Sequence, residues 1–98
     1  MAASNDLIHQ PLRLKIMAAL NVARDDEPLE FNRLKALVQA TDGNLSTHLT
    51  TLESAGYVRI EKEFVGKKPR TRIAITRAGA TAFREHIAYL RDLIDTSG

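Results

Sequence analysis

The segment from Asp42 to Ile75 joins a helix with two unlike faces directly to a basic hairpin, and this junction constrains the fold more than any other feature. Apolar residues recur along the helix at the i, i+4 and i+7 spacing of one buried stripe: Leu45, Leu49 and Leu52. The opposite face carries short polar residues without charge: Asn44, Thr47, Thr50 and Thr51. The pattern predicts a helix over residues 42–55 that packs with one face and presents hydrogen-bonding groups with the other.

A β-hairpin is expected to follow this helix at once. Gly56 ends the helix, and two strands are predicted at about 57–64 and 70–75, with Gly66 and Pro69 marking the turn between them. The basic residues of the chain are concentrated in this region, although the formal net charge is only +2. Residues 57–77 carry seven basic and two acidic groups, whereas residues 1–56 carry five basic and seven acidic groups. A local patch of this kind indicates nucleic-acid binding more strongly than the net charge does.

The residues before the junction predict two further helices and a short strand. Pro11 fits the first position of a helix that runs to Ala23 and is apolar nearly all round, as in a central, buried helix. Residues 29–31 are expected to form a very short strand. Asn32 is expected to cap a second helix, and Thr41 the helix that follows it after a tight turn.

A last helix is expected to begin after Thr76 and to run to about Asp95. Its apolar residues follow a 4-3-4 spacing: Phe83, Ile87, Leu90 and Ile94. Because this helix is longer than packing on a small hairpin needs, we expect it to form a dimer interface together with Leu12 and Ile16 of the apolar helix. The element order predicts a winged helix-turn-helix, an α+β fold that is mostly α.

Composition limits the other classes of protein. The 98 residues favour one domain, and there is no cysteine for a disulfide or a thiolate metal site. Asp6 and Gln10 interrupt the first apolar residues, so no signal peptide is expected, and no run approaches the length of a membrane span. The expected location is therefore the cytoplasm.

Neither catalysis nor a cofactor is expected. The chain lacks the nucleophile, phosphate-loop and zinc-protease motifs that identify common enzyme classes. His9 and His86 are far apart in the sequence and have no Cys or carboxylate companion at ligand spacing, so no metal site is predicted.

Two interpretations apply to the polar helix face and to the basic hairpin. Solvated helix faces usually contain Glu, Lys and Gln, whereas this one is rich in Thr and has no acid between Gly43 and Leu52, which favours a surface that reads duplex DNA. The hairpin lysines either protect an edge strand from aggregation or bind phosphate, and their place after this helix favours phosphate. His48, near the edge of the leucine stripe, either contacts phosphate or hydrogen-bonds within the fold.

Two motifs resemble those of small stand-alone winged-helix transcriptional regulators of the ArsR/MarR-like group. The first is the run from Thr41 to Leu49 with Leu52-Glu53 and Gly56-Tyr57-Val58, and the second is Gly66 to Thr71 with Thr76 and Gly79. The resemblance covers about residues 7–95. One departure is Ile73, where many relatives have an aromatic residue.

The resemblance implies a homodimer that binds double-stranded DNA, with the helix at about 42–55 in the major groove. It implies DNA contacts from Asn44, Ser46, Thr47, His48, Thr50 and Thr51. It also implies that a basic wing at about 64–72 contacts the backbone or minor groove through Lys67, Lys68, Arg70 and Arg72. Glu61 and Glu63 are expected to pair with Arg59, Lys62 or Arg77.

The expected organisation is one domain over residues 1–98, with a winged-helix core at about 11–76 and a C-terminal dimerisation helix at about 77–95. The alternative is a protein-interaction module that keeps this shape without binding DNA. Nothing in the sequence identifies a small-molecule effector.

Overall fold

The computed structural model describes residues 4–23 and 27–97 of the chain. The elements follow in the order α1 (Asp6–His9), α2 (Pro11–Ala23), β1 (Leu29–Glu30), α3 (Phe31–Val38), α4 (Asp42–Ser54), β2 (Val58–Val65), β3 (Lys68–Ile75) and α5 (Arg77–Ser97). This order confirms the predicted winged helix-turn-helix.

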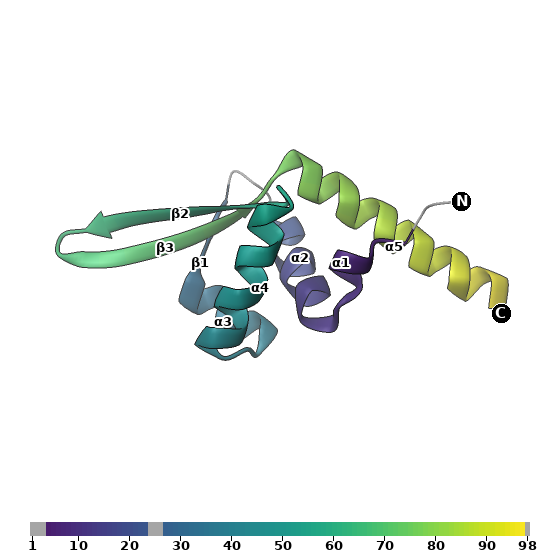
Figure 1. The fold of residues 1–98 in the computed structure, drawn as a ribbon, viewed down its shortest axis with the longest axis horizontal. Coiled ribbons are helices and arrows are strands. Elements are labelled where there is room, and N and C mark those ends of the chain that lie inside the picture. The colour runs from purple at the N-terminus through teal and green to yellow at the C-terminus, as the bar shows by residue number, and fades with distance from the viewer. Residues whose placement is uncertain (1–3, 24–26, 98) are drawn as a thin grey trace.

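The molecule is elongated because two elements project from a small helical body in opposite directions. Helices α1 to α4 form the body, the β2–β3 hairpin extends to one side, and the C-terminal part of α5 extends to the other (Figure 1). The principal extents are 54 × 25 × 21 Å. In the described part of the chain, no helix combines the length and apolar character that crossing a bilayer requires.

The predicted apolar stripes build one core. Leu45, Leu49 and Leu52 of α4 are buried, as the spacing indicated. They belong to a single cluster with buried residues of the other elements: Ile8, Ile16, Met17, Leu20, Leu34, Val38, Val58, Ile73, Ile75 and Phe83. The exposed face of α4 is therefore fixed by the leucines on its opposite face.

The helix-turn-helix differs from the prediction at one end. Helix α3 begins at Phe31, so Asn32 lies inside the helix, and the cap position is taken by Glu30, whose side chain makes no capping hydrogen bond. The pairing of β1 with β3 holds the chain extended up to Glu30 and so sets this start. Thr41 caps α4 as predicted, since its hydroxyl accepts a hydrogen bond from the Asn44 backbone N–H at 3.2 Å.

The three strands form an antiparallel sheet in the order β1-β3-β2. Val65 pairs with Lys68, so only Gly66 and Lys67 form the hairpin turn, and Gly66 has the positive φ (65°) that such turns place at a glycine. The prediction that Pro69 marks the turn was wrong, because Pro69 lies within β3 opposite Phe64. A proline is tolerated there because β1 pairs with β3 only at Arg72 and Ile73, which leaves one edge of β3 open at Pro69.

The start of α5 is fixed against the residues that follow α4 by hydrogen bonds of the Thr76 side chain and backbone. The Thr76 hydroxyl donates to the Gly56 carbonyl at 2.6 Å and accepts from the Gly79 N–H at 3.0 Å, which confirms Thr76 as the cap. The Thr76 N–H donates to the Tyr57 carbonyl at 3.0 Å. A Cβ at Gly79 would lie 2.1 Å from that same carbonyl oxygen, so only glycine fits.

A buried histidine joins α1 to α5. His86 is fully buried, and its Nδ1 accepts a hydrogen bond from the Asn5 backbone N–H at 3.1 Å. Nε2 must then carry the ring hydrogen, which it donates to Nδ1 of His9 at 3.2 Å. The Asn5 side chain also caps α1 at Ile8 and donates to the Tyr57 hydroxyl at 3.1 Å. His9 and His86, distant in the sequence, are therefore neighbours in the fold.

The junction at Gly79 predicts a large loss of stability on a small substitution. Gly79→Ala should lower the free energy of unfolding by about 1–3 kcal/mol, because the added methyl group meets backbone that cannot move independently. The matched control is Gly43→Ala, where nothing lies within 4 Å of an added Cβ and where helix propensity should raise stability by up to about 1 kcal/mol. Urea denaturation followed by circular dichroism measures both, and equal effects would contradict this account of Gly79.

The hydrogen bonds of His86 predict a loss of stability in acid. Burial lowers the pKa of His86 below its ordinary value of 6.5, the neighbouring His9 lowers it further, and Asp6 partly opposes them. In mild acid the unfolded chain therefore binds a proton at this histidine more readily than the folded chain does. The free energy of unfolding should fall as the pH drops below about 6.5, and this group should not affect it at higher pH.

Thermal unfolding between pH 7.5 and 5 tests this expectation. His86→Asn keeps an acceptor for the Asn5 N–H and cannot titrate, so its melting temperature should fall less over this range than that of the wild-type chain. Burial and then the charge of Arg13 also lower the pKa of His48, which therefore adds a loss of the same sign. The double variant His48→Asn/His86→Asn should be flatter than either single variant, and an unchanged slope in all three would contradict the argument.

Candidate nucleic-acid interface

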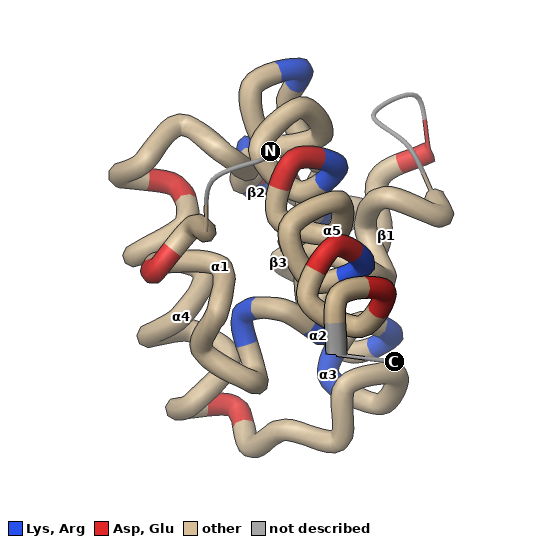
Figure 2. Tube along the Cα trace, turned by 90° about the vertical axis from the view of Figure 1, so that its right-hand side faces the viewer, with Lys and Arg blue, Asp and Glu red and all other residues tan. Residues whose placement is uncertain are grey.

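The exposed face of α4 carries uncharged polar groups between an acid at each end. Figure 2 shows the α4 tube without charged residues through its middle. Asn44, Ser46, Thr47 and Thr50 are exposed, while Thr51 and His48 are partly buried. All six predicted contact residues of this helix therefore lie outside the core on one surface.

The threonine hydroxyls are already committed to the helix. Thr47 donates to the Gly43 carbonyl at 2.9 Å, Thr50 to the Ser46 carbonyl at 3.0 Å, and Thr51 to the Thr47 carbonyl at 3.2 Å. Each hydroxyl oxygen can still accept a hydrogen bond, and each side chain still presents its methyl group. The threonines therefore suit acceptor and methyl contacts, whereas the Asn44 side chain, without a hydrogen bond in the described part of the chain, keeps both donor and acceptor.

His48 is held from within the fold. Nη1 of Arg13, on α2, lies 3.0 Å from Nδ1 of His48, and Nε of Arg13 donates a hydrogen bond to the Leu7 carbonyl. Because a guanidinium only donates, Nδ1 accepts and the ring hydrogen is on Nε2. Burial lowers the pKa of His48, and the charge of Arg13 lowers it further. Of the two interpretations, the structure shows the hydrogen bond within the fold, and the neutral ring can offer only an Nε2–H donor to a ligand.

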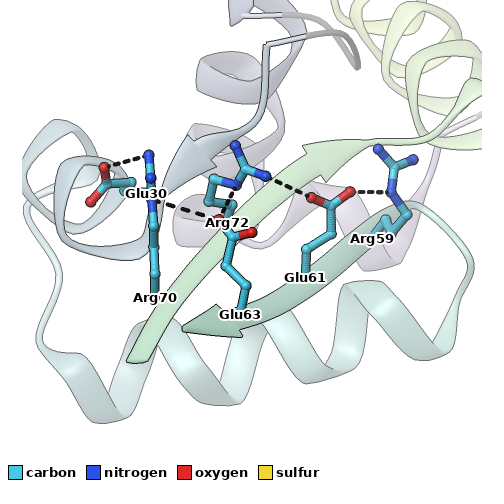
Figure 3. A network of polar contacts seen from close by, with 6 residues as sticks. All are labelled: Glu30, Arg59, Glu61, Glu63, Arg70 and Arg72. Atoms are coloured by element: carbon cyan, nitrogen blue, oxygen red, sulfur yellow. Dashed lines mark hydrogen bonds and ion pairs between the residues drawn. The ribbon is translucent and has the colours of Figure 1, made fainter. Parts of the chain in front are cut away.

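One face of the hairpin carries a neutral row of ion pairs, which we call the charge ladder (Figure 3). It consists of Glu30, Arg59, Glu61, Glu63, Arg70 and Arg72. Glu61 and Glu63 lie directly opposite Arg72 and Arg70 in the strand register. The contacts run from Arg59–Glu61 at 2.9 Å, through Arg72–Glu63 at 3.3 Å, to Arg70–Glu30 at 3.0 Å.

The ladder changes the expected roles of the wing cations. Three guanidiniums of the hairpin face three carboxylates, two from the hairpin and Glu30 from β1, so the ladder as a whole carries no net charge. Of the three cations expected to pair with Glu61 and Glu63, only Arg59 pairs with either, while Lys62 has no ion pair among the described residues. Arg70 and Arg72, which the resemblance implied as DNA contacts, form ion pairs with the carboxylates of the ladder, and their contact with DNA stays a prediction. The unneutralised charge of the hairpin lies on Lys62, Lys67 and Lys68.

The other face of the hairpin looks toward α4. A shallow hollow between the two elements is lined by Phe31, Ser46, Leu49, Thr50, Ile60, Lys62 and Thr71. Lys62 thus shares a surface with Ser46 and Thr50 of the polar helix face. The sequence analysis expected Lys62 to pair with Glu61 or Glu63. The two-residue alternation of a strand, counted from the partly buried Ile60, would have placed Lys62 on this face.

A second surface lies on the projecting part of α5. Phe83 is 8% exposed and belongs to the core, Ile87 and Leu90 are partly buried, and Ile94 is 69% exposed. Residues of both charge signs lie along α5 (Figure 2). The apolar stripe predicted for dimerisation therefore begins in the core and ends on the surface.

The two residues of α2 predicted for the same interface differ from each other. Leu12 is partly buried, but Ile16 is 0% exposed within the single chain and has no surface to offer a second subunit. The all-round apolar pattern of α2 did not separate its inner residues from its outer ones.

Among the described residues, no group of three or more His, Asp or Glu is placed to hold a metal ion.

A polar helix packed beside a two-stranded wing, both on one side of a helix-turn-helix, defines a winged-helix protein. The chain belongs to the winged helix DNA-binding domain family, whose model matches residues 12–94. This confirms the resemblance to winged-helix regulators found in the sequence, and it supports a DNA-binding transcriptional regulator.

Individual relatives agree with this assignment. The chain is 38% identical over 81 residues to an uncharacterized protein of Methanocaldococcus jannaschii, covering 83% of this chain and 85% of that one. It is similar to the solved structure of a transcriptional regulator homologue from Pyrococcus horikoshii OT3, with 30% identity, a TM-score of 0.83 and coverage of 92% and 86%. The fold is also that of the MepR–DNA complex from S. aureus, with 16% identity, a TM-score of 0.69 and coverage of 96% and 70%.

Proposed function

We propose that this protein is a homodimeric transcriptional regulator that binds specific sequences of double-stranded DNA. The observation that carries the proposal is the exposed, uncharged face of α4 beside a hairpin whose free charge is lysine. A helix of this kind fits the major groove, where base pairs present distinct patterns of donors, acceptors and methyl groups. The similarity to a fold that has been solved as a DNA complex supports DNA binding.

In this proposal the two parts of the surface have different tasks. Lys62, Lys67 and Lys68 bind phosphate and supply affinity that depends on salt. Asn44 reads a base edge with both donor and acceptor, while Thr47 and Thr51 contact thymine methyl groups or base donors. Arg70 and Arg72 hold the hairpin through the charge ladder and contribute less to binding than their charge alone implies.

The second subunit is proposed to pack along α5. A symmetric pair needs one surface that complements itself, and the stripe of Ile87, Leu90 and Ile94 is an apolar surface on the element that projects from the body. Two recognition helices held in this way would enter major grooves about 10–10.5 base pairs apart, or a multiple of that spacing. The interface does not include Ile16.

Two substitutions on the DNA surface should have unlike effects. Lys67→Ala should weaken binding to all duplexes similarly and lower the slope of log affinity against log salt by about one. Asn44→Ala should chiefly reduce the difference between the preferred sequence and random DNA, by about 1–3 kcal/mol, because it removes a base contact. Fluorescence polarisation with a sequence selected from a random duplex pool measures both, and equal loss on both DNAs would contradict the role of Asn44.

The charge ladder offers a matched control for the lysines. Lys62→Ala should lower the salt slope as Lys67→Ala does. The paired variant Glu63→Gln/Arg72→Gln removes one cation and one anion from the opposite face and should leave the slope unchanged. If the paired variant lowers the salt slope as much as Lys62→Ala does, the ladder face contacts DNA. If the wild-type chain shows no salt-sensitive binding to any duplex, the protein-interaction alternative is favoured.

The oligomeric state tests the proposed interface separately from DNA. Ile94→Glu should convert a dimer into a folded monomer, because it places a charge in the apolar stripe at a residue that is 69% exposed in the single chain. Leu37→Glu on α3, also exposed at 56%, is the matched control and should leave the mass unchanged. Size-exclusion chromatography with light scattering measures the mass, and a wild-type monomer at micromolar concentration would contradict the proposal.

A further inference from the structure

The tip of the hairpin exposes two neighbouring apolar side chains that the core does not use. Phe64 is 75% exposed and Val65 is 55% exposed, on the last two residues of β2. An aromatic ring held in water on a projecting hairpin (Figure 1) is unfavourable for the isolated chain. The two exposed side chains are therefore available to a binding partner of the hairpin tip.

The strand register places these two residues on opposite faces. Phe64 is two and four residues from Lys62 and Ile60, so it lies on the same strand face as these two residues, which line the hollow beside α4. Its cross-strand partner is Pro69. Val65 lies on the same strand face as Glu61 and Glu63 of the charge ladder. Phe64 therefore continues the face that looks toward α4, while Val65 and its partner Lys68 continue the face of the charge ladder.

The charges around Phe64 select the partner. Lys62 lies on the same strand and face as Phe64, Lys67 lies in the turn, and Lys68 lies at the tip opposite Val65, on the other face. None of the three lysines has an ion pair among the described residues. An apolar ring on a hairpin tip that also carries three unneutralised lysines fits a polyanion that offers apolar surface as well. Duplex DNA has both, because sugars and base faces line its minor groove beneath the phosphates.

We propose that Phe64 is an apolar wedge that enters the DNA minor groove next to the major groove occupied by α4, with the tip lysines on the flanking phosphates. The inference rests on the proposed function, because α4 must bind DNA for the hairpin to reach the adjacent groove. The ring contacts the sugars and partly unstacks one base step, as apolar side chains of minor-groove proteins do.

A wedge of this kind adds sequence preference without a hydrogen bond. Pyrimidine–purine steps unstack and kink more easily than other steps, so the site contacted by the hairpin tip should favour them. This preference should disappear when the ring is removed, whereas the preference for the bases contacted by α4 should remain.

Three variants of the full chain test the inference on a duplex that the wild-type protein selects from a random pool. Phe64→Ala should weaken binding about tenfold, the scale of losing one aromatic stacking contact, and Phe64→Leu should recover most of the loss because it restores a wedge. Val65→Ala is the matched control on the other face and should change affinity by less than about twofold. Both positions are exposed, and thermal unfolding checks that the variants remain folded.

A second readout reports the wedge itself. Duplexes that carry 2-aminopurine at single positions beside the selected site should show increased fluorescence at one step with the wild-type chain and with Phe64→Leu, but not with Phe64→Ala. If the wild-type chain binds in a salt-sensitive manner and Phe64→Ala matches Val65→Ala, the wedge is wrong and the proposed function stands. If the wild-type chain selects no duplex, both are wrong.

Discussion

The arrangement of the proposed DNA surface depends on the register of one hairpin, which a two-residue turn fixes. With Gly66 and Lys67 as the only turn residues, Val65 must face Lys68, and every pair along the hairpin follows from that contact. Glu63 then meets Arg70 and Glu61 meets Arg72, so the carboxylates neutralise arginines on one face. The same register places Lys62 and Phe64 on the other face of the hairpin. A shift by one residue would exchange these faces and turn the acids toward the recognition helix.

Much of the fold was predictable from the sequence because its signals are local. The leucine stripe of α4, the threonine caps and Pro11 at the start of α2 are each read within one or two turns of a helix. The error at Pro69 had a larger effect, since a turn drawn too long hides the register and with it the pairing of Arg70 and Arg72. Proline usually marks a turn, and only the absence of a β1 neighbour at that level explains why it is tolerated in β3.

Other features depend on contacts between distant segments, which no local pattern reveals. His86 is buried because α1 covers it, and the contact joins residues 5 and 9 to the middle of α5. Arg13 then links α1 to α4 through the Leu7 carbonyl and His48. Helix α1 is only four residues long, yet its hydrogen bonds connect the proposed dimerisation helix with the recognition helix. The orientation of α5 relative to α4 is therefore held at both ends of this path, by α1 and by the contacts of Thr76 with Gly56 and Tyr57.

A rigid connection between these two helices matters because a single winged helix has a small footprint. One module of this size buries about 600–1,000 Å² of its own surface on DNA, and neutralising a few phosphates gives binding that weakens steeply with salt. Pairing two copies makes the second contact intramolecular, which raises affinity without any new contact, provided that the spacing of the two recognition helices matches the groove repeat. That spacing is set by the angle between α4 and α5 and not by either helix alone. In the proposed dimer, the buried histidine, the glycine at 79 and the threonine cap would therefore contribute to sequence recognition by fixing this angle.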